Sequence, residues 1–109
     1  MNALDPIDVY APSAPGSLMR AYRINRAGVF RLARRSCEIY SVQIVAAGAW
    51  GRVQLEDAAG ELKFLQPSMF TGSFWLSGGA IGGLIARVDA RDAAPNLTVN
   101  WRETDQEMV

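Results

Sequence analysis

Alternation of apolar and polar residues is the clearest pattern in the sequence, and it predicts short β-strands. In the segment WGRVQLEDAAGELKFLQP, Val53 and Leu55 alternate with polar neighbours. After the turn residues 57–60, Leu62 and Phe64 resume the alternation. A period of two is that of a half-buried strand. Because Asp can bond nearby backbone and Gly accepts positive φ, the segment predicts a β-hairpin.

The run CEIYSVQIVA is the second strong strand candidate, since it is rich in β-branched and aromatic residues. Strict alternation divides its apolar side chains between two faces, with Tyr40, Val42, Ile44 and Ala46 on one and Cys37, Ile39 and Val45 on the other. We therefore expect both faces of this strand to be at least partly covered.

Three further strands are predicted downstream, in FTGSFWLS, AIGGLIARVDA and LTVNWRE. In the last of them, Leu97, Val99 and Trp101 share one face, as a half-buried strand requires. The segment SLMRAYRINRAGVFRLARRS is more ambiguous. Its alternation favours two strands separated at residues 25–28, and two short helices are the alternative.

These elements predict an all-β fold. About seven or eight short strands without a convincing helix must each hide one apolar face, so packed antiparallel sheets or a closed barrel are the economical solutions. We expect an antiparallel β-sandwich of jelly-roll-like arrangement. Residues 1–17, with three of the five prolines, predict an extended N-terminal arm. Residues 18–103 form the sandwich domain in this division, and residues 104–109 a short acidic C-terminal tail.

Composition narrows the chemistry. The chain has no histidine and a single cysteine, which removes the commonest general base and the usual zinc and copper sites. We therefore expect no enzyme activity, no catalytic or metal-binding residues and no cofactor. The zero formal net charge gives no general affinity for nucleic acid. We expect neither a membrane span nor secretion, and a single cysteine, which cannot form an internal disulfide, fits synthesis in a reducing compartment.

Three alternatives for chemistry remain open at this point, and one of them is a glycosidase-type pair of carboxylates contributed by distant strands. Glu56, Asp57 and Glu61 flank one turn and could collect a calcium ion, although they also suit a solvated turn. Cys37 could be a nucleophile if Arg34 and Arg35 lower its pKa, or it could be a small buried hydrophobe.

The stretch GSFWLSGGAIGGLIARV is rich in glycine, but its spacing matches no phosphate-binding loop. We expect a turn at Gly78 and Gly79. At Gly82 and Gly83 we expect a bulge or close contact, where a neighbouring backbone or a large side chain such as Trp75 or Trp101 approaches.

Arginines and tryptophans are the remaining candidates for binding. One segment carries six arginines before any acid intervenes: Arg20, Arg23, Arg26, Arg31, Arg34 and Arg35. This segment could be a nucleic-acid patch, a solvated face, or an interface that meets the acidic arm or tail of another subunit. Three tryptophans could stack on sugars, although core or subunit contact is favoured: Trp50, Trp75 and Trp101.

The C-terminal half, PSMFTGSFWLSGGAIGGLIARVDARDAAPNLTVNWRE, resembles the closing strands of small all-β virion proteins from tailed bacteriophages and phage-like particles. The resemblance covers residues 37–103. It implies a non-enzymatic capsid decoration or head–tail accessory protein, assembled in the bacterial cytoplasm as a homo-oligomer such as a trimer, and bound to a capsid or tail protein. A carbohydrate-binding module that uses exposed Trp is the alternative.

Overall fold

The structure, a computed structural model, describes residues 6–9, 19–46, 51–66, 71–90 and 93–103. These residues contain nine strands and no helix. The strands are β1 (Ile7–Asp8), β2 (Met19–Ile24), β3 (Gly28–Ala33), β4 (Cys37–Val45), β5 (Gly51–Asp57), β6 (Leu62–Gln66), β7 (Gly72–Ala80), β8 (Leu84–Ala90) and β9 (Asn96–Glu103). The predicted all-β sandwich is confirmed, and each of the eight strands expected from the sequence is present.

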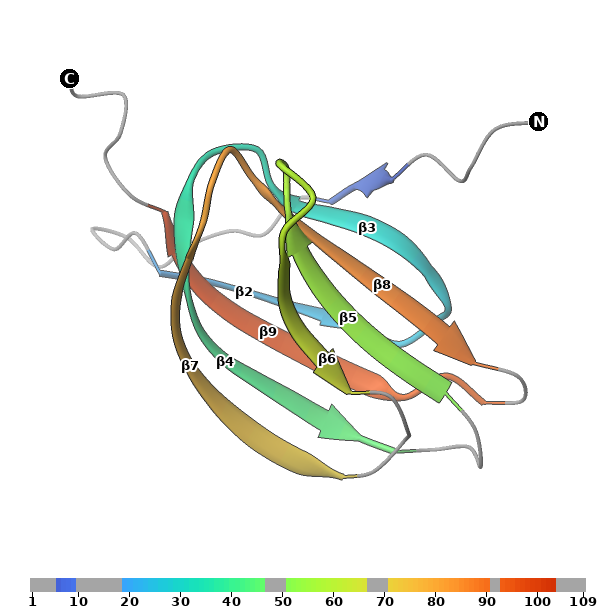
Figure 1. Cartoon of the computed structure of the whole chain (residues 1–109). Helices are drawn as coiled ribbons and strands as arrows, with labels where there is room; N and C mark the ends of the chain where they lie inside the picture. The colour runs from blue at the N-terminus through green and yellow to red at the C-terminus, as the bar shows by residue number, and fades with distance from the viewer. Residues whose placement is uncertain (1–5, 10–18, 47–50, 67–70, 91–92, 104–109) are drawn as a thin grey trace, which may run out of the picture.

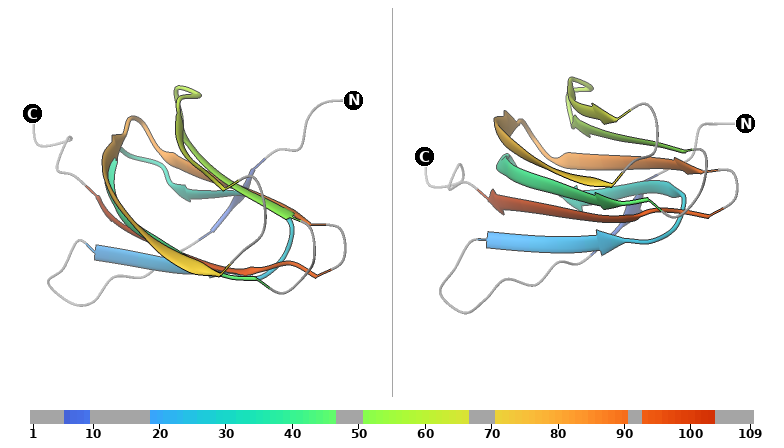
Figure 2. Two further views of the ribbon diagram at one scale, coloured as in Figure 1. Left: turned by 60° about the horizontal axis from the view of Figure 1, so that its bottom comes forward. Right: turned by 90° about the horizontal axis from the view of Figure 1, so that it is seen from below.

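Two sheets face each other across the core (Figures 1 and 2). One has the order β1-β3-β8-β5-β6 and the other the order β2-β9-β4-β7. The antiparallel pairs β2–β9, β3–β8, β4–β7 and β5–β6 are nested inside one another and alternate between the sheets. The chain is thus one long hairpin with its apex between β5 and β6, and its successive strand pairs form the two sheets. This arrangement is a jelly roll.

The short strand β1 is the exception to antiparallel pairing among the described strands. It pairs in parallel with β3, with Ile7 opposite Phe30 and Asp8 opposite Arg31. The described part of the predicted arm therefore lies along the edge of its own domain.

Strand β9 shows how the alternation builds the core. Leu97, Val99 and Trp101 are all fully buried, whereas the two residues between them are only partly buried. Val53 and Leu55 of β5 are also fully buried. Burial of such apolar side chains is the main favourable contribution to folding.

Strand β4 departs from strict alternation at Tyr40. Ile39 lies opposite Trp101 and Ser41 opposite Asn100, so Tyr40 is an extra residue on this strand. This β-bulge reverses the alternation, and as a result Cys37 and Ile39 are buried on the same side as the later apolar residues of the strand. The predicted division of β4 between two faces is therefore wrong.

The ambiguous segment forms two strands, as the alternation favoured, and the helical alternative is wrong. Because β2 pairs with β9 and β3 pairs with β8, the two consecutive strands belong to different sheets. Residues 25–27 carry the chain from one sheet to the other. Sequence spacing alone gives no signal for this change of sheet, since a hairpin turn has a similar length.

The Gly-rich stretch bends the chain, but not where the spacing predicted. Gly78 and Gly79 lie inside β7, opposite Ile39 and Glu38, because the β4–β7 ladder continues to Ala80. The turn at Gly78 and Gly79 is thus a wrong prediction; the chain turns at residues 81–83. The expected close approach is present at Gly83, whose φ is +149°.

The atom nearest to the Cβ position of Gly83 belongs to the backbone, and neither Trp75 nor Trp101 supplies any of the three nearest atoms. A Cβ atom on Gly83 would lie 2.7 Å from the carbonyl oxygen of Ala33. Glycine is required here for two reasons, the positive φ and the absence of space.

Gly83→Ala should lower the free energy of unfolding by about 2 kcal/mol, because alanine is strained at this φ and collides with a backbone oxygen. Gly78→Ala is the matched control, since no atom lies within 4 Å of its Cβ position. The control should change stability by no more than about 0.5 kcal/mol. Urea titration of both variants measures the difference; equal stabilities would contradict the assigned close approach.

Candidate interaction surfaces

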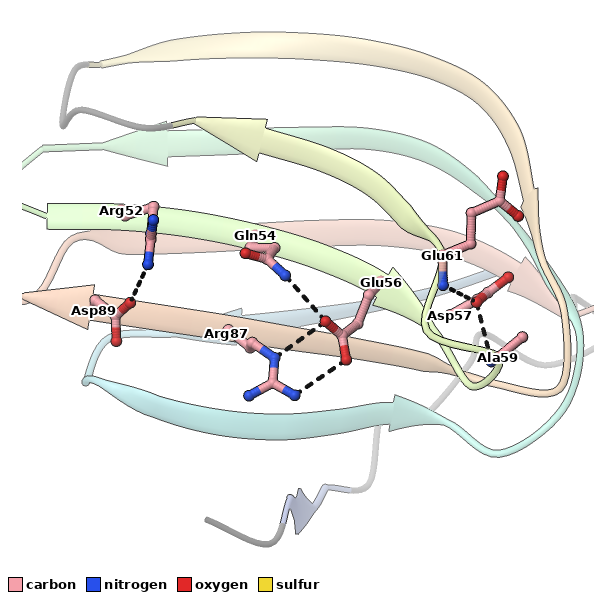
Figure 3. A network of polar contacts seen from close by, with 8 residues as sticks. All are labelled: Arg52, Gln54, Glu56, Asp57, Ala59, Glu61, Arg87 and Asp89. Carbon is pink, nitrogen blue, oxygen red and sulfur yellow. Dashed lines mark hydrogen bonds and ion pairs between the residues drawn. The ribbon is translucent and has the colours of Figure 1, made fainter. Parts of the chain in front are cut away.

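The turn at the apex of the long hairpin is organised by the buried carboxylate of Asp57 (Figure 3). Its Oδ1 accepts hydrogen bonds from the backbone N–H groups of Ala59, at 3.0 Å, and Glu61, at 2.9 Å. Its Oδ2 accepts one from the N–H of Ile81, at 3.3 Å, in the β7–β8 turn. A second link joins the same turns, because the N–H of Ala58 donates to the carbonyl of Ile81.

These contacts hold Asp57 ionised. The hydrogen bond from Glu61 N–H is the largest cause that lowers the pKa of Asp57 below its ordinary value of 3.8, and the positive charge of Lys63 adds to it. A carboxylate that accepts several backbone hydrogen bonds is stabilised in its charged form.

The three acids considered for calcium do not converge on one point. Both oxygens of Glu56 accept from Arg87 at 3.1 Å, and Glu61 lies 3.2 Å from Lys63. The carboxylate of Asp57 is directed at the amides of the turn. In the part of the chain that the structure describes, no group of three or more His, Cys, Asp or Glu side chains could hold a metal ion.

Cys37 is buried at the start of β4. Burial is the larger cause that raises the pKa of its thiol to about 12, and the carboxylate of Glu103 adds to the increase. Arg34 and Arg35 therefore do not activate this thiol, and at neutral pH it stays protonated. The interpretation as a small buried hydrophobe agrees with this environment.

The outer face of the five-stranded sheet carries cross-strand ion pairs between β5 and β8 (Figure 3). The guanidinium group of Arg87 pairs with the carboxylate of Glu56, which also accepts a hydrogen bond from the side-chain amide of Gln54. Nη2 of Arg52 lies 3.6 Å from Oδ2 of Asp89. Opposite charges on neighbouring strands stabilise the pairing modestly. This face is therefore a solvated, charge-paired surface.

The six arginines of the basic segment do not form one patch, because neither Arg23 nor Arg26 is among the residues that line the groove shared by the other four. Arg26 lies over the ring of Phe30, with 5.2 Å from its Cζ to the ring centroid. Four of the six instead line a groove of about 490 Å³ with two acids, and the whole lining is Asp8, Val9, Arg20, Arg31, Leu32, Ala33, Arg34, Arg35 and Glu103.

Within this groove the acids neutralise part of the arginine charge. Asp8 lies 3.3 Å from Arg31 and 3.0 Å from Arg34, and Glu103 lies 3.5 Å from Arg20. The sequence suggested that an acidic arm or tail of one subunit meets the basic segment of another. In the single chain, the same pairing occurs within the molecule.

The tryptophans have opposite environments. Trp101 lies in a central strand and is fully buried, as the core interpretation predicted. Trp75 lies on the edge strand β7 and is 80% exposed, because its neighbours Phe74 and Leu76 point toward the core. Trp50 lies outside the described residues.

The second edge strand on the same side of the sandwich is β6, as the contact between Phe64 and Phe74 shows, with ring centroids 5.1 Å apart. Two further large apolar side chains of β6 are exposed, Leu62 and Leu65. We call β6 and β7, with exposed Leu62, Leu65 and Trp75, the β6–β7 rim.

Comparison with known proteins adds no relative. A scan against protein-family models finds no match, and no curated protein shows significant sequence similarity to the chain. The resemblance to accessory virion proteins therefore stays a prediction. Within the described residues, no helix has the length and apolar character needed to cross a membrane.

Asp57→Asn should lower the melting temperature near pH 7, because the amide offers one acceptor oxygen where the carboxylate offers two. The pKa of Asp57 is lower in the folded protein than in the unfolded chain, so its contribution to stability is complete above pH 3.8 and declines as the pH falls further. The difference in melting temperature between wild type and variant should therefore shrink below that pH.

Asp89→Asn is the control, since it removes an acid whose side chain is 56% exposed and paired with Arg52. We expect it to change the melting temperature little at any pH. Thermal unfolding from pH 2.5 to 7 compares the variants. A loss in Asp57→Asn that is the same at every pH would show that the charge of Asp57 is not what stabilises the turn.

Proposed function

We propose that this chain is a non-enzymatic structural component of a virion, a capsid decoration or head–tail accessory protein that assembles as a homo-oligomer on a phage-like particle. The observation that carries the proposal is the combination of a jelly roll with large apolar side chains left exposed on the β6–β7 rim. Jelly rolls are common in viral capsid and lectin domains, which is an analogy at the level of the fold.

The ion pairs support a role without catalysis. Every acidic side chain in the described residues lies between 3.0 and 3.9 Å from a Lys or Arg nitrogen, in the pairs Asp8 with Arg31 and Arg34, Glu38 with Arg102, Glu56 with Arg87, Asp57 and Glu61 with Lys63, Asp89 with Arg52, and Glu103 with Arg20. A general acid at neutral pH needs a carboxyl group with a raised pKa, and a neighbouring cation acts in the opposite direction.

Strand β7 supports assembly. It is a nine-residue edge strand, GSFWLSGGA, without a charged residue or proline. The edge strands β2 and β6 differ, because they carry Arg20, Arg23 and Lys63. Soluble proteins usually protect a long edge strand by charge or proline, so an unprotected one is suited to pair with a partner. Exposed tryptophan is also enriched at protein interfaces.

Trp75→Lys should shift the protein from oligomer to monomer while its melting temperature stays within about 3 °C of wild type, because an 80% exposed side chain contributes little to the core. Ile81→Lys is the control, since Ile81 is 66% exposed but lies in a turn at the end of the sandwich. Size-exclusion chromatography with light scattering over a concentration series measures the mass.

A wild-type chain that stays monomeric throughout this series, and that does not bind purified particles, would contradict the proposal. Genes for capsid and tail proteins beside the coding sequence would support it.

Carbohydrate binding is the second candidate, and the exposure of Trp75 favours it. An exposed indole can stack on the apolar face of a sugar ring. In that case a glycan should shift the fluorescence of the wild type to shorter wavelength, and Trp75→Ala should abolish the shift without loss of stability. If no glycan on an array changes the emission, sugar binding is excluded for that set of glycans.

A further inference from the structure

The edge of β3 that faces away from β8 binds a short extended segment of the N-terminal arm. The structure shows which backbone and side-chain groups make the contact. Ile7 and Asp8 pair in parallel with Phe30 and Arg31. The N–H of Val9 then donates to the carbonyl of Arg31 at 3.2 Å. These backbone contacts are those of a peptide added as a strand to a sheet edge.

Side chains add recognition to this backbone pairing. The two oxygens of Asp8 divide between two arginines, with Oδ1 at 3.3 Å from Arg31 and Oδ2 at 3.0 Å from Arg34. Val9 is partly buried and packs against the core. An apolar residue that follows an acidic one therefore fits the site, with the acid bound by paired guanidinium groups.

Residues 7–9 make only a few contacts with their own domain. Strand β1 has only two residues, and both are exposed, Ile7 at 46%. The side chain of Asp8 is 44% exposed, so its ion pairs are open to solvent. Nine residues, 10–18, lie between the described arm and β2. A connection of this length spans at most about 30 Å when extended, which is enough to reach an adjacent copy of a domain this size.

We propose that this site on β3 binds residues 7–9 of a neighbouring copy of the same chain, so that exchanged arms link copies in the assembly. The inference rests on the proposed function, because it needs copies held close together. An exchanged arm makes the same contacts as the arm in its own domain, so the local concentration of copies decides between the two states.

The groove is suited to an acidic protein segment and unsuited to nucleic acid. When Asp8 leaves with the arm, the lining still contains the carboxylate of Glu103, which would repel a phosphate backbone. No aromatic side chain is among its lining residues, so bases have no stacking surface there. Arg31 and Arg34 both pair with the carboxylate of Asp8, which is the contact that an acidic arm offers.

Reversed charges test the exchange in full-length chains. One variant carries Asp8→Lys, which reverses the charge of the arm and leaves the site on β3 unchanged. The other carries Arg31→Glu with Arg34→Glu, which reverses the charge of the site and leaves the arm unchanged. In each variant alone the arm and site repel, whereas in a mixed pair both arm contacts join opposite charges. Native mass spectrometry of the equimolar mixture counts the like and unlike pairs.

Arm exchange predicts at least about a tenfold excess of unlike pairs over the statistical ratio of one to two to one. The control mixture joins Glu38→Lys with Arg102→Glu, which reverses an ion pair between adjacent strands of one sheet. We expect the statistical ratio for this control. A thermal unfolding transition confirms that each chain is folded, and Arg34→Glu alone, at a side chain 70% exposed, replaces the double variant if that chain does not fold.

Statistical mixing of the arm variants would overturn the exchange. If wild type forms oligomers and the mixed variants form like and unlike pairs in that statistical ratio, the proposed assembly function stands and only arm exchange fails. If neither wild type nor any mixture forms pairs, both the exchange and the homo-oligomer fail.

Discussion

The fold depends on the carboxylate of Asp57, which holds the apex of the long hairpin. All four nested strand pairs follow from the reversal of the chain between β5 and β6. At that point one buried anion accepts hydrogen bonds from Ala59, Glu61 and Ile81. Burial of a charge is costly unless hydrogen bonds and an opposite charge compensate it, and here three amides and Lys63 do so. The apex is thereby tied to the β7–β8 turn.

The same end of the sandwich contains two further close contacts. The N–H of Gly82 donates to the hydroxyl oxygen of Ser36 at 2.9 Å, which joins the β7–β8 turn to the β3–β4 turn. Gly83 in turn leaves room for the carbonyl of Ala33. Three turns that are far apart in sequence therefore form one unit. Because the turns at this end contact one another, the edge strands at the sides of the sandwich are the surfaces left for association.

The sequence predicted the local structure well, because alternation within a strand depends only on which face is buried. The hairpin at Asp57 and the strand with buried Trp101 are clear in the pattern for this reason. The bulge at Tyr40 was not predictable, because it exists only relative to the register of β9. Likewise, Gly78 reads as a turn residue, and the β4–β7 ladder decides that it lies in a strand.

The interaction surfaces were less predictable than the strands. Trp75 and Trp101 both lie in apolar strands, and their exposure differs because one strand is at an edge and the other is central. The grouping of arginines and acids along the chain did signal an electrostatic contact. Which acid meets which arginine depends on β1 returning to β3, and this contact joins segments separated by residues 10–18 and the whole of β2.

Amide hydrogen exchange of the native protein, followed by NMR, tests the role of Asp57 most directly. We expect the amides of Ala59, Glu61 and Ile81, although they lie in turns, to exchange as slowly as those of the neighbouring strands and to lose protection together in Asp57→Asn. If these three amides exchange in the wild type at the rate of an unprotected loop, the buried carboxylate does not hold the apex, and the account of the fold given above is contradicted.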